Sequence, residues 1–350
     1  MKIVTVNAST KYDVRIGSGL LPNTPALLKK VTKAEKLCIV SDSNVWPLYG
    51  AGLESALKAD GYHVISFVFP AGEESKNGET YLLLLNFLAE NRVTRSDCLV
   101  ALGGGVVGDL TGFAAATYLR GIDFIQIPTT LLAAVDSSVG GKTAIDLPAG
   151  KNLCGAFYQP KLVICDTDTL STLPEDIFRD GCAEVIKYGI LYDPKLFYHL
   201  MENGLSFHRE EVIARCVELK RDVVANDEFD RGGRQKLNLG HTIGHSVEAL
   251  SHFSLSHGKS VAIGTAIITR AAEKLGICDC DTRDQVLQIL HKFGLPTVTN
   301  HSSADLLRCA LSDKKRSGGN VNLIIPERIG FCRICPTPIE KLQSIIEAGL

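Results

Sequence analysis

The chain has 350 residues, 45% of them hydrophobic, and a formal net charge of −2 at pH 7. This length and hydrophobic content predict two domains with buried cores. Because charges of both signs are interspersed and no uncharged apolar run reaches about eighteen residues, the composition excludes a polybasic nucleic-acid surface and a membrane span. We therefore expect a small-molecule partner.

The cysteines and the N-terminus predict a cytoplasmic protein. Residues 1–6 are predicted to form a strand, so no signal peptide is expected. Eleven scattered cysteines then favour a reducing compartment. Cys332 and Cys335 form a lone CxxC pair, which we expect to be free thiols because no second pair accompanies it.

The first half of the chain alternates between strand and helix patterns. Residues 1–32 carry alternating apolar positions divided by glycines, which predicts a hairpin. Short apolar runs at 37–40, 64–68 and 98–102 then alternate with helical stretches that end near residues 61 and 91. This order is typical of a parallel α/β sheet.

Ligands of such sheets bind beyond the carboxyl ends of the strands. That edge would hold Asp42, the loop 72–76 and the glycines 103–105. A glycine turn before a helix lets a backbone approach a pyrophosphate and presents the amides of the helix N-terminus. The turn lacks the GxGxxG pattern, so a tight turn that only packs is the alternative interpretation.

A helix over 110–119 and a strand over 124–130 lead into glycine-rich loops. These loops hold Asp136, Lys142, Lys151 and Asn152. Two lysines with an aspartate and an asparagine indicate a site for a phosphorylated polyol. The alternative is that the lysines are only solvated, as loop lysines usually are.

The second half is predicted to be mostly helical and to form a separate domain. Helical periodicity covers 179–191, 210–225, 237–250, 261–275 and 282–293. A basic loop at 313–319 then leads into a strand at 321–325. We expect the chemistry in the cleft between the two domains.

Histidines on one predicted helix form a candidate metal site. His241 and His245 are four residues apart and would share a helix face, with Asn238 one turn earlier. Glu184 and His257 could complete a carboxylate–imidazole set of the kind that binds a divalent metal. The alternative is that the histidines are hydrogen-bonded in the core, because position 242 is Thr where the zinc motif with this spacing carries Glu.

The ordered motifs resemble the 3-dehydroquinate synthase family, the sugar-phosphate cyclases of the shikimate pathway. The resemblance covers nearly the whole chain and rests on residues 72–76, 103–109, 118–121, 128–132, 135–143, 150–152, 155–157, 183–188, 237–245 and 257–258. It implies a Rossmann-like parallel α/β nucleotide-binding domain over 1–173, a mostly helical metal- and substrate-binding domain over 174–350, and a homodimer.

The resemblance also implies site residues. The metal ligands, for zinc or cobalt, would be Glu184, His241 and His257, which makes His245 a substrate contact. The NAD contacts would be Asp42, Asn44, Glu73, Lys76, Gly104, Gly105, Asp109, Thr129, Thr130, Lys142, Lys151, Thr169, Leu170, Ser171 and Thr172. The substrate contacts would be Asp136, Lys142, Asn152, Lys187, Lys220, Arg234, Asn238, His245 and either Lys314 or Lys315, with Arg120 reaching a phosphate from the neighbouring subunit.

The implied activity converts 3-deoxy-D-arabino-heptulosonate 7-phosphate into 3-dehydroquinate and phosphate, with NAD reduced and restored in each turnover. Alternatives are another sugar-phosphate cyclase, such as a 2-epi-5-epi-valiolone or 2-deoxy-scyllo-inosose synthase, a metal-dependent polyol dehydrogenase, or a non-catalytic NAD-binding protein. The family commonly has an acidic residue where this chain has Lys259. If that acid steadies a metal histidine, metal affinity would be lower here.

Overall fold

The structure, a computed structural model, describes residues 1–252, 254–314 and 319–350. They form two compact units: unit 1 is Met1–Pro174 with Arg209–Phe229, and unit 2 is Glu175–His208 with Asp230–Leu350. The expected division into 1–173 and 174–350 differs from these units in the segment 209–229. That segment belongs to unit 1 because its helix, α7 (Arg209–Asn226), packs against the first two strands of the chain.

Unit 1 is built on a seven-stranded sheet. In spatial order its strands are β1 (Lys2–Asn7), β2 (Lys11–Gly17), β9 (Leu162–Asp166), β6 (Asp123–Pro128), β5 (Cys98–Gly103), β3 (Lys36–Asp42) and β4 (His63–Phe69). The predicted hairpin is confirmed, since β1 and β2 pair antiparallel. The predicted parallel sheet is also confirmed, since β2, β9, β6, β5, β3 and β4 run parallel.

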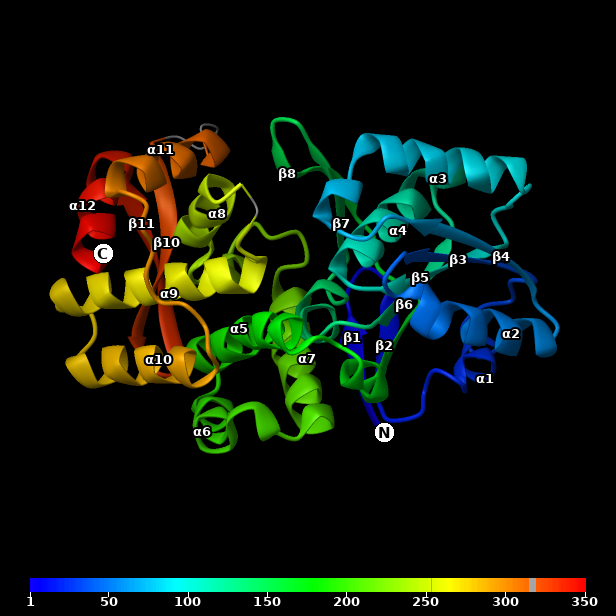
Figure 1. Cartoon of the computed structure of the whole chain (residues 1–350), viewed down its shortest axis with the longest axis horizontal. Coiled ribbons are helices and arrows are strands. Elements are labelled where there is room, and N and C mark those ends of the chain that lie inside the picture. The colour runs from blue at the N-terminus through cyan, green and yellow to red at the C-terminus, as the bar shows by residue number, and fades with distance from the viewer. Residues whose placement is uncertain (253, 315–318) are drawn as a thin grey trace. The chain divides into compact units, whose positions relative to one another are not determined.

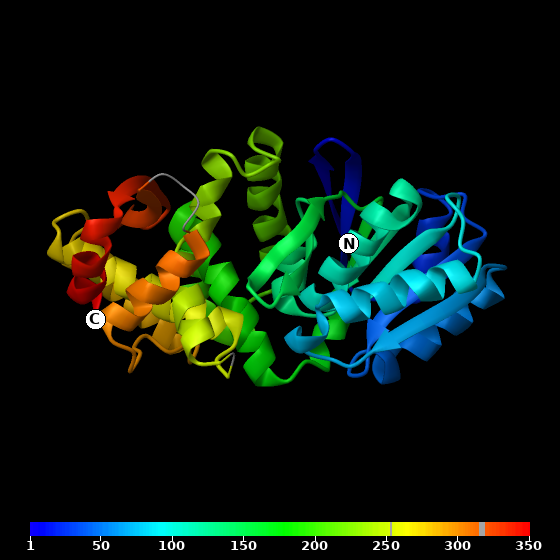
Figure 2. The same ribbon diagram turned by 90° about the horizontal axis from the view of Figure 1, so that it is seen from above.

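Helices cover both faces of this sheet (Figure 1). Alternate residues of β3 point to opposite faces: Leu37 and Ile39 join one apolar core, and Cys38 and Val40 join the other. The first core is closed by α1 (Thr24–Leu28) and α2 (Ala51–Ala59). The second is closed by α3 (Gly78–Glu90) and α4 (Gly105–Thr117), which Figure 2 shows from above.

A separate two-stranded hairpin corrects one expectation for unit 1. Lys142, Lys151 and Asn152 were expected in glycine-rich loops, but they lie on β7 (Lys142–Leu147) and β8 (Gly150–Phe157), which pair antiparallel. Asn152 has a φ of 55°, so β8 is irregular at that residue. Glycines and exposed positions in β8 weaken the alternation that would have marked it as a strand.

Unit 2 is mostly helical, as predicted, with one two-stranded hairpin. Its helices are α5 (Glu175–Leu191), α6 (Pro194–Asn203), α8 (His241–Leu250), α9 (His257–Lys274), α10 (Cys280–Lys292), α11 (Ser303–Lys314) and α12 (Ile339–Gly349). The hairpin pairs β10 (Asn320–Arg328) with β11 (Phe331–Pro338). The helix α9 contacts α5, α8, α10 and α12 and is the centre of the unit. Among the residues described, none of the helices has the length and apolar character that a membrane crossing needs.

Candidate functional site

Three side chains of the predicted metal set converge in unit 2. Glu184 comes from the middle of α5, while His241 and His257 are the first residues of α8 and α9. Oε1 of Glu184 lies 3.6 Å from Nε2 of His241 and 3.5 Å from Nε2 of His257. The candidate ligand atoms of all three lie within 4.8 Å of one another. The structure therefore brings together residues that are far apart in sequence.

Glycines allow the helices to approach closely enough for this convergence. A Cβ at Gly264 would lie 2.0 Å from the carbonyl oxygen of Gly240, and a Cβ at Gly244 would lie 2.8 Å from that of Ser260. The start of α9 is equally close to α5, since a Cβ at Gly258 would lie 2.0 Å from the carbonyl of Asp180. Any larger residue at these positions would separate the helices that carry the three side chains.

Gly240 also corrects the helix expected over 237–250. Its φ of 75° interrupts the helix, and Asn238 ends a short helical turn, η7 (Gly233–Asn238), that precedes α8. Asn238 and His241 therefore do not share one continuous helix. In contrast, α9 begins at His257, four residues before the expected start at 261, and this earlier start places His257 on a helix.

Burial and charge set the protonation of the two histidines. Burial lowers the pKa of His241 well below its usual range, and the nearby Lys187 ammonium lowers it further. Burial also lowers the pKa of His257, but hydrogen bonds to the carboxylates of Glu184 and Glu248 outweigh this effect and raise the pKa to about 10. Lys187 is buried and forms an ion pair with Glu184.

The donor set fits a divalent metal ion. It offers one fully buried carboxylate and two imidazole nitrogens that face it, and such a set suits zinc or cobalt with coordination positions left for substrate. A second group within the same distance limit consists of His245, Glu248 and His257. His257 is common to both groups.

His245 lies beside the metal set on the face of α8 that also carries His241. Its ring centroid is 5.3 Å from that of His241 and 5.8 Å from that of His257, and its side chain is exposed. An exposed imidazole next to a metal set is available to a bound substrate. The role of His245 as a substrate contact stays a prediction.

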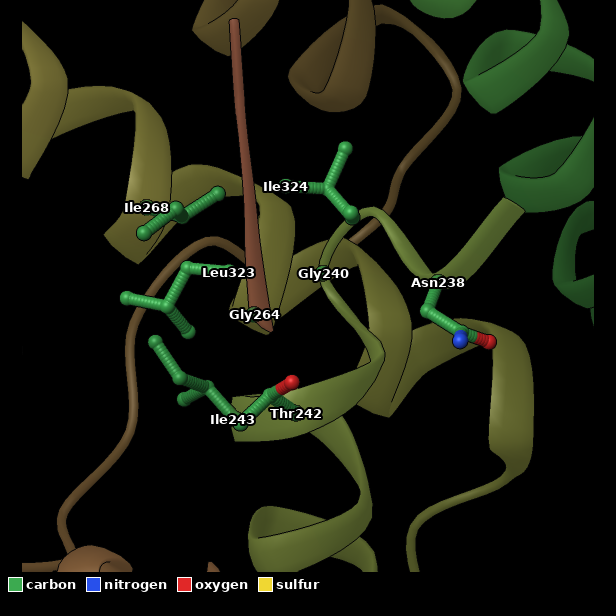
Figure 3. Close-up of a pocket in the computed structure, with 8 residues that line it drawn as sticks. All are labelled: Asn238, Gly240, Thr242, Ile243, Gly264, Ile268, Leu323 and Ile324. Atoms are coloured by element: carbon green, nitrogen blue, oxygen red, sulfur yellow. The ribbon is translucent and has the colours of Figure 1, made fainter. Parts of the chain in front are cut away.

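A small pocket lies at the start of α8 and is shown in Figure 3. Its lining is mostly apolar and consists of Asn238, Gly240, Thr242, Ile243, Gly264, Ile268, Leu323 and Ile324. The side-chain amide of Asn238 points away from the apolar residues in Figure 3. None of the three metal candidates lines the pocket, but Gly240 and Thr242, which flank His241 in the chain, do.

The candidate NAD edge lies at the carboxyl ends of the parallel strands of unit 1. The strand order changes direction between β3 and β5, because β4 lies on one side of β3 and β5 on the other. Asp42 ends β3, and Gly104 follows β5 and precedes α4. In open α/β sheets such a switch point is where nucleotides bind. A Cβ at Gly104 would lie 3.1 Å from Cγ2 of Thr130, so a larger residue would crowd this turn.

Hydrogen bonds order the rest of this edge. The Asp42 carboxylate accepts from the backbone N–H of Asn44, and the Tyr49 hydroxyl lies 3.1 Å from the carbonyl of Thr169 and 2.6 Å from the Thr172 hydroxyl. The candidate residues Thr169, Leu170 and Ser171 form a short turn after β9, with Thr172 next, and Thr129 and Thr130 follow β6. Tyr49 was not predicted, because its role depends on a contact between distant segments.

A charged cluster at the same edge surrounds Lys76. Its ammonium lies 2.8 Å from Glu73, 3.4 Å from Asp109, 3.7 Å from Asp146 and 2.9 Å from the amide oxygen of Asn152. Burial would lower the pKa of Lys76, but Asp109 and Glu73 outweigh it and raise the pKa. Lys151 lies 3.4 Å from Glu73. The structure thus brings Glu73, Lys76, Asp109, Lys151 and Asn152 together.

Asp146 is a member of this cluster that the sequence reasoning missed. Its carboxylate accepts from the backbone N–H of Asn152 at 2.8 Å, and its own N–H donates to the carbonyl of Lys76. Nothing in the local pattern of β7 distinguishes this aspartate from a solvated one. Glu248, beside His257, was missed for the same reason.

The candidate substrate contacts are distributed over both units. Lys220 pairs with Asp136 at 2.7 Å in unit 1, where Lys142 and Asn152 also lie. Lys187, Arg234, Asn238 and His245 belong to unit 2. Arg234 is 1% exposed and is among the largest buried side chains. Lys314 ends α11, and Lys315 lies outside the described residues.

Arg120 is placed differently from the other candidates in unit 1. It lies in the short turn η3 (Tyr118–Arg120) after α4, just before β6 begins, and so at the amino edge of the sheet. It is exposed and has a φ of 69°. The structure does not bring Arg120 together with the residues at the carboxyl edge of the same chain.

The fold and the site define a class of protein: an α/β unit with a nucleotide-type switch point, joined to a helical unit with a carboxylate–imidazole metal set. Two family models match the chain, 3-dehydroquinate synthase N-terminal over residues 66–180 and 3-dehydroquinate synthase C-terminal over residues 181–316. The chain belongs to the 3-dehydroquinate synthase family.

Two 3-dehydroquinate synthases match nearly the full length of the chain and support its assignment to this family. The 3-dehydroquinate synthase of Enterococcus faecalis (strain ATCC 47077 / OG1RF) is 42% identical over 358 residues and covers 100% of both chains. That of Clostridium acetobutylicum is 46% identical over 339 residues, covering 95% of this chain and 94% of the relative.

Solved structures of sugar-phosphate cyclases share the fold. The 2-epi-5-epi-valiolone synthase ValA from Streptomyces hygroscopicus subsp. jinggangensis, with NAD+ and Zn2+ bound, is 28% identical, has a TM-score of 0.89 and covers 99% of this chain and 97% of its own. A 2-deoxy-scyllo-inosose synthase complexed with carbaglucose-6-phosphate, NAD+ and Co2+ has a TM-score of 0.90 at 24% identity, covering 100% of both chains. The expected fold class is confirmed.

Proposed function

We propose that the chain is a carbon–oxygen lyase that converts 3-deoxy-D-arabino-heptulosonate 7-phosphate into 3-dehydroquinate and phosphate, using NAD and a divalent metal. The observation that carries this proposal is the buried carboxylate of Glu184 facing the Nε2 atoms of His241 and His257 in a chain of this family. The relatives at 42% and 46% identity bear the name of this activity.

Both cofactors have matching residues. Zinc or cobalt would be held by Glu184, His241 and His257. NAD would be held at the carboxyl edge of unit 1, by Asp42, Asn44, the cluster around Lys76, the Gly104 turn and the threonines after β6 and β9. When bound, NAD supplies a reversible hydride acceptor, and the metal makes a coordinated substrate hydroxyl more acidic. The presence of NAD+ and Zn2+ in ValA, at 28% identity, supports both assignments.

His245 is proposed to move a proton at the reacting hydroxyl of the substrate. An exposed imidazole beside the metal set can accept or donate a proton near neutral pH. Asn238, at the end of η7, would hold another hydroxyl through its amide.

Cationic side chains are proposed to hold the two anionic ends of the substrate. Lys142, Lys187, Lys220 and Arg234 lie on ordered elements, and all except Lys142 are buried. Fixed cations stabilise a departing phosphate and an enolate better than solvated ones, because they need no reorganisation during the reaction. Asp136 positions Lys220 through their ion pair, and Asn152 adds an amide next to Lys76.

We assign the protein to the cytoplasm as a homodimer. The cytoplasmic assignment follows from its eleven free cysteines, which suit a reducing compartment. Arg120 lies at the amino edge of its own sheet. In a homodimer it would reach a phosphate bound to the neighbouring subunit.

The proposal is tested by adding the heptulosonate phosphate to the purified protein with NAD and zinc and measuring phosphate release. We expect stoichiometric phosphate and no lasting absorbance of NADH, because the hydride returns to the substrate. Accumulation of NADH would instead indicate a polyol dehydrogenase. Phosphate release from sugar phosphates that lack a carboxylate, but not from the heptulosonate phosphate, would indicate another cyclase.

A further inference from the structure

The two ring nitrogens of His257 face two different carboxylates. Nε2 lies 3.5 Å from Oε1 of Glu184, and Nδ1 lies 3.5 Å from Oε2 of Glu248. Both carboxylates are buried, with side chains 0% and 5% exposed. Burying a carboxylate destabilises a protein unless the carboxylate is paired or hydrogen-bonded. The contact with His257 provides such a partner for Glu248.

Glu248 is carried to this position by the helix that supplies His241. Both residues lie on α8, and a separation of seven residues places them on the same face of a helix. Because α8 packs against α9 through Gly240, Gly244 and Gly264, that face meets the start of α9, where His257 lies. The helix α8 thus provides both the candidate ligand His241 and the carboxylate of Glu248, which contacts Nδ1 of the other candidate ligand, His257.

His241 shows the same arrangement with a different acceptor. Its Nδ1 lies 3.0 Å from the carbonyl oxygen of Leu239, and its Nε2 faces Glu184. Both histidines therefore have Nδ1 next to an oxygen acceptor and Nε2 directed at the same carboxylate. Histidines that bind metals usually donate the second ring N–H in this way, which fixes the tautomer and the ring orientation.

The side chain of residue 259 does not occupy the position behind His257. The backbone N–H of Lys259 donates to Asp180, and its ammonium donates to Asp176 at 3.2 Å. Asp176 lies in the first turn of α5. A lysine at position 259, where the family commonly has an acidic residue, therefore does not remove the carboxylate that contacts His257.

We propose that Glu248 is a positioning residue that accepts a hydrogen bond from Nδ1–H of His257 and so directs Nε2 of this histidine at the metal. This inference rests on the metal site of the proposed function. The competing arrangement is a second metal ion held by His245, Glu248 and His257. The two exclude each other at His257, because Nδ1 cannot both donate to Glu248 and bind a metal.

The test is the zinc affinity of the full-length chain without substrate or NAD, measured by competition with a chromophoric chelator. Glu248→Gln keeps the size of the side chain but removes its charge, and we expect it to weaken zinc binding by about tenfold to hundredfold. Glu273→Gln is the matched control. Glu273 lies on α9, pairs with Arg283 and is not part of either metal group. The zinc affinity of Glu273→Gln should therefore equal the wild-type value. The Co2+ forms should differ in visible spectrum for Glu248→Gln alone.

A second measurement observes the wild-type chain and uses a variant only to assign the signal. In zinc-loaded protein labelled with 15N-histidine, we expect His257 to carry its proton on Nδ1, with the signal assigned by its loss in His257→Asn. A proton on Nε2 would overturn the proposal. So would wild-type zinc affinity in Glu248→Gln, or a stoichiometry of two zinc ions per chain that falls to one in this variant.

These outcomes separate the inference from the proposed function. Zinc binding needs neither the sugar phosphate nor the reaction, so a chain that releases no phosphate can still show the effect of Glu248→Gln. A wild-type chain that binds neither Zn2+ nor Co2+ would contradict both. Tight binding that is unaffected by Glu248→Gln would contradict only the role of Glu248.

Discussion

The ammonium of Lys220 lies 2.7 Å from the carboxylate of Asp136 and donates to the backbone carbonyl of the same residue at 2.6 Å. The Lys220 side chain is 7% exposed. Lys220→Met should therefore lower the free energy of unfolding by about 1 to 3 kcal/mol, because it leaves a partly buried carboxylate without this cation. Urea unfolding measures the change.

The neighbouring residue on α7 provides the control for this prediction. Arg221 pairs with Asp222, and the two side chains are 32% and 60% exposed, against 7% for Lys220. Arg221→Met should change the free energy of unfolding by less than about 1 kcal/mol. Equal losses in the two variants would show that the Lys220–Asp136 pair contributes no more than a surface pair.

His245→Ala should retain zinc and NAD binding but lose turnover by at least about a hundredfold, because it removes the proposed proton carrier without touching the metal set. Phosphate release and equilibrium zinc binding are measured on the same preparation. His199→Ala, at a half-buried histidine on α6 that belongs to neither metal group, is the control and should behave as wild type. A near-normal rate in His245→Ala would exclude this residue from the reaction.

His257→Ala should weaken zinc binding by more than about a hundredfold, because it removes a ligand atom itself. Changes to residues that only hydrogen-bond to a ligand typically weaken binding by up to about a hundredfold. Metal content after dialysis against a chelator checks this. If the metal content is unchanged, His245 becomes the candidate for the third ligand in place of His257.

Gly264→Ala tests the close approach of α8 and α9. Its Cβ would lie 2.0 Å from the carbonyl of Gly240, so the helices must separate, at a cost of about 1 to 3 kcal/mol in the free energy of unfolding. Zinc affinity should fall as well, because His241 and His257 move apart. Gly52→Ala is the control: its Cβ would meet no atom within 4 Å, and the change should be neutral or stabilising by up to about 1 kcal/mol.

The stability of unit 1 should depend on pH through Asp109. Burial raises the pKa of this carboxyl from 3.8 to about 7, although Lys76 acts in the opposite direction. The folded protein therefore keeps the proton up to about pH 7, whereas the unfolded chain releases it near 3.8. The resulting stability is complete below about pH 4 and is lost as the pH rises through 7.

Asp109→Asn removes this titration and is the comparison. Between pH 5 and pH 8 the wild type should lose more stability than the variant, by an amount of the order of 1 to 3 kcal/mol. Urea unfolding at the two pH values measures the difference. Parallel pH profiles in both proteins would contradict a raised pKa at Asp109.

The sheet of unit 1 could be predicted because its strands are buried on both faces and read as continuous apolar runs. The strands β3 and β5 are buried along almost their whole length, which leaves little ambiguity in the pattern. The hairpin of β7 and β8 could not be predicted, because its exposed residues and glycines resemble a loop. The break at Gly240 was missed because a single positive φ does not disturb the spacing of apolar residues around it.

The metal set required more than local pattern. The spacing of His241 and His245 suggested a metal site that Glu184 and His257 could complete, and the family resemblance then chose Glu184, His241 and His257 as the ligands and made His245 a substrate contact. The structure brings Glu184, His241 and His257 together, but the ligand assignment itself stays a prediction. Glu248 and Asp146 act through contacts between separate elements, so no spacing along the chain marks them.

Because residues 209–229 belong to unit 1, that unit is completed later in synthesis than its strands alone would require. A nascent chain that ends at Pro174 holds every strand of the seven-stranded sheet but lacks α7, which packs against β1 and β2. Unit 1 therefore cannot close until Phe229 has left the ribosome, and by then α5 and α6 of the other unit have already been made. Fragments cut at residue 174 would leave the N-terminal hairpin without α7, whereas the intact polypeptide supplies that helix before unit 2 is complete.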